Sequence, residues 1–186
     1  MDLNLFTGSI GYLNFKTDSF LKNILALIFN SVGVIIIALL TTTAFSNNTE
    51  YINFFEESST KMQLWYTSEM TDLPWLNTTV PISNGIINLA AMSLLCGMVM
   101  FFAVDSYNKS QSIFGITLMI PTFILSGFQH SIVNIYYFMV YLAGNRWSIP
   151  DLIPCLQFLG VCLLGNSIGA LLAKFCSGFM LQKEEK

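Results

Sequence analysis

The chain alternates between long apolar runs and shorter polar segments. Long windows within these runs contain no charged side chain, which a soluble fold with a polar outer face can seldom supply. At a rise of about 1.5 Å per residue, roughly 20 residues cross a hydrocarbon core of about 30 Å as a helix. The pattern predicts an all-α integral membrane protein with one transmembrane domain over residues 1–186 and spanning helices at about residues 20–43, 82–104, 113–142 and 152–180.

The third run is longer than one crossing requires and carries a polar hexamer, Ser126-Gly127-Phe128-Gln129-His130-Ser131, near its middle. Irregular backbone at membrane depth is tolerated only where protein or a water-filled cavity satisfies its N–H and C=O groups. Broken helices of this kind mark substrate sites in transporters. We therefore expect this helix to be broken at residues 126–131, with a functional site at the break.

A polar segment at about residues 46–81 separates the first two runs and carries acidic and aromatic side chains, which predicts a long extracytoplasmic loop. The first residues of the chain lack the basic and apolar regions of a cleaved signal peptide. If each spanning helix crosses the membrane once, Lys61 and Arg146 are the only basic residues on the same side as this loop. The opposite side, with the C-terminus, should be cytoplasmic because it receives Lys16, Lys22, Lys109, Lys174, Lys183 and Lys186.

Composition supports the membrane prediction and excludes several function classes. Hydrophobic residues make up 54% of the chain, charged residues 10%, and the mean hydropathy is +0.62. A net charge of -3 provides no basic stripe for nucleic acid. The apolar segments contain no carboxylate pair, metal cluster or nucleophile with a base, so we expect neither an enzyme nor a cofactor or metal site. The four cysteines, Cys96, Cys155, Cys162 and Cys176, lie in or beside these apolar segments, and we expect them to be small packing residues.

A four-residue pattern, Asn-Ser-aliphatic-Gly, occurs in two of the predicted helices, at residues 30–33 and 166–169. Each copy follows a polar break, and on the predicted topology the two helices run in opposite directions. Inverted repeats place paired broken helices at a shared site near the membrane midplane. The asparagines could equally serve as interhelical hydrogen-bonding groups.

Several short motifs resemble those of the formate/nitrite transporter family. The family's loops in its second and fifth helices, its sixth-helix signature and the start of its fourth helix are matched by Asn4-Leu5-Phe6-Thr7-Gly8, Ser126 to Asn134, Gly165 to Gly169 and Gly85-Ile86-Ile87-Asn88. The chain departs from the family in three ways. The family's first helix and the first half of its second are absent, Gln129 stands where a glutamate is usual, and the segment from Gly85 to Asn88 is one residue shorter.

The resemblance implies an aquaporin-like inverted-repeat helical bundle that is incomplete at its N-terminus and starts with a half-helix at about residues 3–14. It also implies a homopentamer in the bilayer, in the family's case a bacterial inner membrane. Each protomer would conduct small monovalent anions such as formate, nitrite, hydrosulfide, acetate or lactate.

Roles at the pore follow from the same resemblance. His130 would be the central pore histidine and Thr7 its hydroxyl neighbour, Phe123 a hydrophobic constriction, and Asn88 and Asn166 polar pore-lining groups. From the residues themselves, the half-helices restarting after Gly8 and after Gln129 should aim free N–H groups at a cavity. Ser131 should cap the second of these helices, and His130 could donate a hydrogen bond or a proton.

Two other function classes compete with the anion channel. A non-conducting truncated subunit or membrane scaffold of the same fold is the first alternative, because the loss of one and a half helices could open the pore wall. An intramembrane enzyme would need acidic or Cys/His pairs facing one another within the bilayer, which the sequence does not offer.

Overall fold

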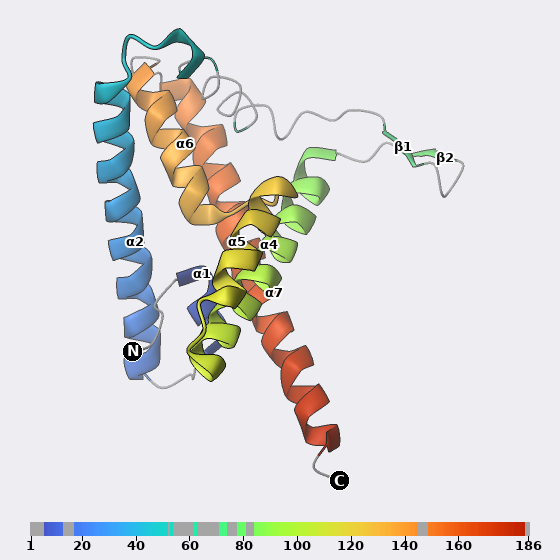
Figure 1. Ribbon diagram of the computed structural model, residues 1–186. Helices are drawn as coiled ribbons and strands as arrows, with labels where there is room; N and C mark the ends of the chain where they lie inside the picture. The colour runs from blue at the N-terminus through green and yellow to red at the C-terminus, as the bar shows by residue number, and fades with distance from the viewer. Residues whose placement is uncertain are drawn as a thin grey trace.

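The computed structural model describes residues 6–12, 17–51, 53, 62, 71–73, 78–80, 84–144 and 149–184. This part of the chain forms an elongated helical bundle with a small hairpin set apart from it (Figure 1). In chain order the elements are α1 (Phe6–Ser9), the 3-10 helix η1 (Ile10–Tyr12), α2 (Thr17–Ala44), β1 (Thr71–Leu73), β2 (Thr78–Val80), α4 (Asn84–Ser110), α5 (Phe114–Leu125), α6 (Ser131–Gly144) and α7 (Ile149–Glu184).

Three of these helices contain stretches that are long and apolar enough to cross a membrane, and α5 and α6 are shorter apolar helices. The three stretches are Phe20–Ala44 in α2, Gly85–Ser110 in α4 and Leu152–Ser177 in α7. The predicted membrane helical bundle is therefore confirmed. The predicted third run corresponds to two helices, because α5 ends at Leu125 and α6 begins at Ser131.

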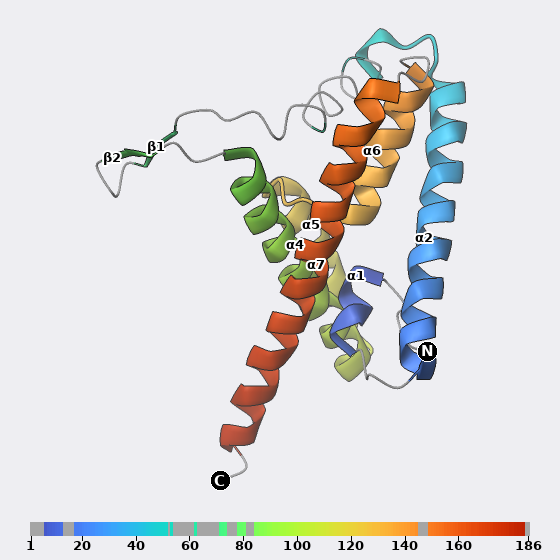
Figure 2. The ribbon, with the colours of Figure 1, turned by 180° about the vertical axis from the view of Figure 1, so that it is seen from behind.

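The helices alternate in direction. Figures 1 and 2 show α2 running one way, α4 and α7 running the opposite way, and α5 followed by α6 running with α2. The copies of Asn-Ser-aliphatic-Gly thus lie on antiparallel helices, α2 and α7. The short helix α1 lies between α2 and the α4–α7 pair and contacts both sides.

The most extensive interface, between α4 and α7, depends on glycines that allow the two backbones to touch. A methyl group on Gly97 of α4 would collide with the backbone of Asn166, and one on Gly169 of α7 would collide with the backbone of Leu94. Small residues allow this close approach where lipid provides no hydrophobic driving force between helices. The crossing fixes Asn166 directly against α4.

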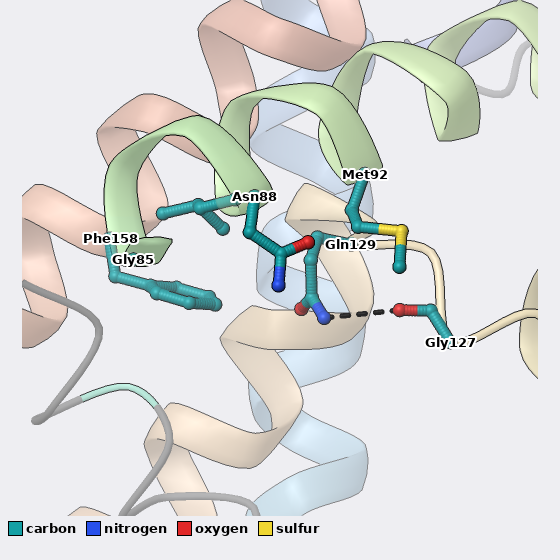
Figure 3. A pocket seen from close by; sticks show the side chains of 7 residues that line it. Gly85, Asn88, Met92, Gly127, Gln129 and Phe158 are labelled. Atoms are coloured by element: carbon teal, nitrogen blue, oxygen red, sulfur yellow. Dashed lines mark hydrogen bonds between the residues drawn. The ribbon is translucent and has the colours of Figure 1, made fainter. Parts of the chain in front are cut away.

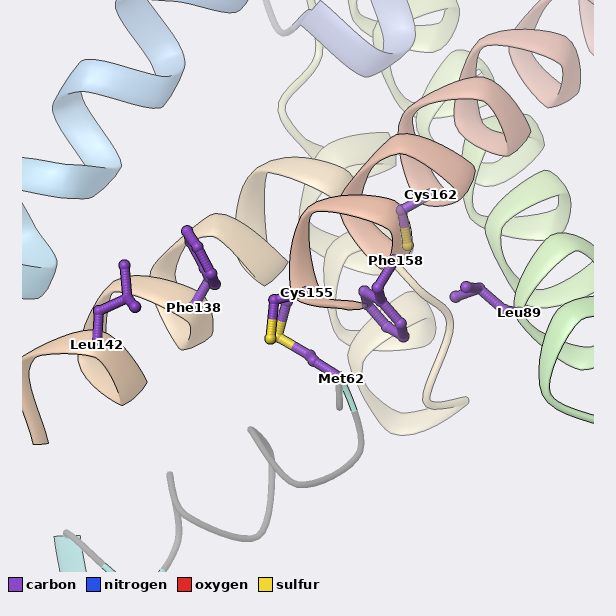
Figure 4. Packing of buried hydrophobic residues seen from close by; sticks show 7 residues of the cluster. All are labelled: Met62, Leu89, Phe138, Leu142, Cys155, Phe158 and Cys162. Carbon is purple, nitrogen blue, oxygen red and sulfur yellow. The ribbon is translucent and has the colours of Figure 1, made fainter. Parts of the chain in front are cut away.

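One side of α7 packs in an apolar cluster next to this crossing. Figure 4 shows Cys155, Phe158 and Cys162 of α7 converging with residues of α4 and α6. All are buried, and the remaining members of the cluster are Met62, Leu89, Phe138 and Leu142. The cluster holds α6 and α7 together on the loop side of the break.

The helix α2 is attached to α6 mainly near its C-terminal end. Ala38 and Val140 are buried between the two helices. The hydroxyls of Thr41, Tyr136 and Tyr51, which we call the hydroxyl cluster, lie beside them. The Tyr136 hydroxyl is 2.9 Å from Thr41 Oγ1 and 3.0 Å from the Tyr51 hydroxyl. Since the Thr41 hydroxyl donates to the Ile37 carbonyl (2.9 Å), Tyr136 is the donor toward Thr41.

Two features differ from the sequence prediction. The loop at residues 46–81 contains an antiparallel hairpin, in which Thr71 pairs with Val80 and Leu73 with Thr78, so the described chain is not helical throughout. Of the predicted half-helix at residues 3–14, the structure describes residues 6–12, which form one α-turn and a 3-10 turn, while its remaining residues, Asn4 and Leu5 of the motif among them, lie outside the described residues. Helix α1 therefore starts before Gly8, and the 3-10 helix follows it directly at Ile10.

Candidate functional site

The break between α5 and α6 begins with a defined helix end. Gly127 adopts a φ of 67°, a left-handed conformation that glycine accepts readily. Its N–H donates to the Ile124 carbonyl (3.1 Å), and the Phe128 N–H donates to the Phe123 carbonyl (3.1 Å). These two bonds form a Schellman motif, which satisfies carbonyls that a helix end leaves unpaired. The chain is thereby turned out of α5 at a fixed angle.

His130 forms the other boundary of the break, as the N-cap of α6. Its Nδ1 accepts a hydrogen bond from the Val133 N–H (3.3 Å), which is the third residue of the helix. A lone pair on Nδ1 leaves Nε2 to carry the proton of the neutral ring, so Nε2–H is the donor that remains. The prediction that Ser131 caps α6 is wrong, because Ser131 is the first helical residue and its hydroxyl has no partner among the described residues.

Asn166 of α7 holds the break from the opposite side. Its Nδ2 donates to the carbonyls of Gln129 (2.8 Å) and Ser93 (2.7 Å), and its Oδ1 accepts from the Ser131 N–H (2.8 Å). The side chain is 0% exposed. The carboxamide is thus engaged on both its oxygen and its nitrogen, and it fixes the backbone on each side of His130.

These bonds change the expectation about the start of α6. The N–H groups of Ser131 and Val133 are taken by Asn166 and by the imidazole of His130. They are therefore not free to face a cavity, contrary to what the broken-helix pattern suggested. The positive end of the α6 dipole remains, carrying roughly half a charge.

Gln129 belongs to a buried polar network. Its Nε2 donates to the Gly127 carbonyl (3.1 Å), and its Oε1 accepts from Asn134 Nδ2 (3.3 Å). The same Asn134 amide is 3.2 Å from Cys162 Sγ, and the Ser93 hydroxyl, which donates to the Leu89 carbonyl (2.6 Å), lies 3.3 Å from the same sulfur. The network links the break to α4, α6 and α7, and it uses Gln129 as both donor and acceptor.

His130 faces a cavity of about 320 Å³ between α1, α2 and the break, which we call the histidine cavity. Thr7 lines the same cavity, and its hydroxyl is buried without a hydrogen-bond partner among the described residues. The structure therefore brings these two predicted residues together. The full lining is Phe6, Thr7, Phe29, Asn30, Gly33, Val34, Ile37, Met100, His130 and Ile132.

A second cavity, of about 200 Å³, is formed by α4, α7 and the break, and we call it the glutamine cavity. Figure 3 shows the side chains of Asn88, Met92 and Gln129 lying around it, with the Gln129 amide directed to the Gly127 carbonyl. Asn88 is thus separated from His130, since each contributes to a different cavity. Adjacent residues of the break, Gln129 and His130, serve the two cavities.

Comparison with known protein families identifies the family of this chain. A family model described as "Formate/nitrite transporter" matches residues 3–179. The chain belongs to the formate/nitrite transporter family. It is accordingly an integral membrane protein of a family that transports small anions. Comparison with curated proteins and with solved structures gave no match.

Two other predicted site residues, Phe123 and Gly8, make mainly packing contacts. The Phe123 ring stacks on the His130 imidazole at a centroid distance of 5.3 Å, and it is buried in a cluster with Cys96 and Met100. Gly8 lies so close to α4 that a methyl group there would collide with the Met100 carbonyl and with Val104. Phe123 therefore orients the imidazole, and Gly8 allows α1 to reach α4.

Four polar residues of the candidate site, Gln129, Asn30, Ser93 and Asn134, were not predicted as site residues. Asn30 lines the histidine cavity, while Ser93 and Asn134 belong to the network around Gln129. The sequence signals were present, because Asn30 is the repeat partner of Asn166 and Asn134 ends the motif around His130. Ser93 had no such signal, because its hydroxyl bonds to the Leu89 carbonyl of its own helix (2.6 Å), as serines in apolar helices commonly do.

Proposed function

We propose that the chain is a channel or transporter that carries small monovalent anions, of the formate, nitrite or hydrosulfide type, past His130. The observation that supports this function is the histidine cavity, where Nε2–H of His130 and the unpaired hydroxyl of Thr7 share one space. Acetate and lactate are larger monovalent anions of the same class, and we include them among the candidate substrates.

An anion within the bilayer needs hydrogen-bond donors in place of its lost hydration. Transfer of a bare ion into a low-dielectric interior costs tens of kcal/mol in the Born limit. The cavity offers neutral donors on an otherwise apolar wall that includes Val34, Ile37 and Met100. Hydrogen bonds strengthen in such low-dielectric surroundings. A neutral histidine that donates from Nε2 attracts the anion without trapping it in an ion pair.

The cap geometry favours histidine as a hydrogen-bond donor over histidine as a proton carrier. A second ring proton on Nδ1 would break the bond from the Val133 N–H and place a positive charge at the positive end of α6. We therefore expect the ring to remain neutral during transport.

We further propose a homopentamer in a bacterial inner membrane with a cytoplasmic C-terminus. The start of α2 and the ends of α4 and α7 lie at the same end of the bundle (Figures 1 and 2). These helix ends carry Lys22, Lys109 and Lys174. Excess lysine marks the cytoplasmic side.

Stopped-flow light scattering on proteoliposomes tests the function. Vesicles holding the wild-type chain are challenged with formate, nitrite or hydrosulfide, beside protein-free vesicles. His130→Asn is the informative variant, because asparagine is a good N-cap but does not reproduce the Nε2–H donor. We expect flux above the empty vesicles for the wild type and about tenfold less for the variant. Equal flux in both would contradict the role of His130.

A second candidate is a non-conducting scaffold of the same fold, favoured by the poor packing of α2. Only 6% of its apolar span is buried, against 39% for each of the spans in α4 and α7. A helix so exposed leaves the side of the histidine cavity weakly closed. Well-folded protein without flux for any anion would support this candidate.

A further inference from the structure

The two repeats use the same asparagine in different ways. Asn30 of α2 and Asn166 of α7 occupy the same place in Asn-Ser-aliphatic-Gly, on helices that run in opposite directions. The carboxamide of Asn166 is consumed by the break, through bonds to Gln129, Ser93 and Ser131. It has no donor left for a ligand.

Asn30 has a different environment. It is partly exposed and lines the histidine cavity, and its side chain makes no hydrogen bond to the residues that the structure describes. Its neighbours on the same face of α2, Gly33, Val34 and Ile37, line the cavity as well and are apolar. Since Asn30 lines the cavity and its carboxamide has no partner among the described residues, the carboxamide is available to a molecule inside the cavity.

A second, independent observation points to a ligand in this cavity. The Thr7 hydroxyl is 1% exposed and unpartnered within the described chain. Buried polar groups are rarely left in this state, and each exception needs an explanation such as an absent water or ion. Thr7 on α1, Asn30 on α2 and His130 at the break thus supply three polar groups from three elements to one cavity.

We propose that Asn30 is a specificity-determining residue that donates its Nδ2–H group to the transported anion and selects small oxyanions. This inference rests on the function proposed above. Amide and imidazole N–H groups recognise oxygen acceptors well, whereas sulfur is a weak acceptor. Formate and nitrite each present two acceptor oxygens, so donors on either side can bind one anion together. Hydrosulfide gains little from Asn30.

The test compares formate and hydrosulfide flux in the same proteoliposomes. Asn30→Leu keeps the approximate size of the side chain and removes the amide, and Asn30→Ala is the second variant should leucine prevent folding. We expect the ratio of formate to hydrosulfide flux to fall about tenfold, the loss of roughly one hydrogen bond. Asn30→Asp places a carboxylate in the cavity and should reduce the flux of both anions.

The matched control is Asn166→Leu, the same change in the other repeat. It should lower the midpoint of thermal unfolding in detergent, whereas Asn30→Leu should leave the midpoint close to that of the wild type. An unchanged flux ratio in Asn30→Leu or Asn30→Ala, with normal wild-type transport, would overturn the role of Asn30 and leave the proposed function standing. Absence of wild-type flux for both anions would overturn the two together.

Discussion

Replacing Asn166 with alanine removes the carboxamide that holds both sides of the break. Three hydrogen bonds are lost, of 2.7, 2.8 and 2.8 Å. The Ser93 carbonyl lies within α4 and keeps its place in the helix ladder. The Gln129 carbonyl and the Ser131 N–H lie at the break, where no repeating ladder supplies a substitute.

The cost follows from these two groups. A buried donor or acceptor left unsatisfied costs about 1–3 kcal/mol, so the pair should cost about 2–6 kcal/mol. The tight α4–α7 crossing limits how far water could enter to replace the amide, because Gly97 lies directly against the backbone of Asn166. We therefore expect Asn166→Ala to be strongly destabilised.

The assay is unfolding of the purified protein in detergent, followed by its elution profile after heating. Ser167→Ala is the matched control on the next residue, since its hydroxyl bonds only to the Leu163 carbonyl of its own helix (2.7 Å). We expect a small change there. If Asn166→Ala unfolds at the same temperature as Ser167→Ala, Asn166 does not hold the break.

Three further predictions concern the surroundings of the break. Gln129→Glu loses the donor toward the Gly127 carbonyl (3.1 Å) unless the acid is protonated. Its stability in detergent should therefore be greater at about pH 4.5 than at about pH 8, a dependence larger than that of the wild type. Gly97→Ala should disrupt the α4–α7 crossing and reduce the yield of folded protein, whereas Gly160→Ala should be tolerated because an added Cβ there meets nothing within 4 Å. Equal yields of the two variants would contradict the claim that the α4–α7 contact requires glycine at position 97. Tyr136→Phe should lose about 1–3 kcal/mol of stability with its bonds to Thr41 and Tyr51, while Tyr107→Phe, the control in α4, should lose little. Matching melting curves for these two variants would argue against the hydroxyl cluster as a clamp.

The broad architecture was predictable because it depends on run lengths and on one polar interruption. Charge-free runs of more than about 20 residues leave few alternatives to spanning helices. The hexamer at residues 126–131 likewise could not continue a lipid-exposed helix, and α5 and α6 end and begin beside it. The pairing of Thr7 with His130 in one cavity was anticipated through the family resemblance.

The detailed roles at the site depend on helix rotation and depth, which run lengths do not determine. Asn88 was expected at the pore with His130, but it lies beside Gln129 in the glutamine cavity, while the Ser93 carbonyl, further along α4, bonds to Asn166 at the break. The roles of Asn30 and Asn166 could not be separated from identical local sequence, because each role is set by what the opposite element places nearby. The hairpin at Thr71–Val80 was missed because polar loop composition carries little strand signal.

The cap on α6 makes the imidazole of His130 part of the helix it begins. A ring that is bonded through Nδ1 to the Val133 N–H and stacked on Phe123 cannot swing by itself. It moves when α6 moves. Further along the same helix, Tyr136 joins α6 to α2 and to Tyr51. Helix α6 therefore connects the His130 imidazole at its N-terminus to the hydroxyl cluster at Tyr136, so that a shift of α2 against α6 would be transmitted to the imidazole.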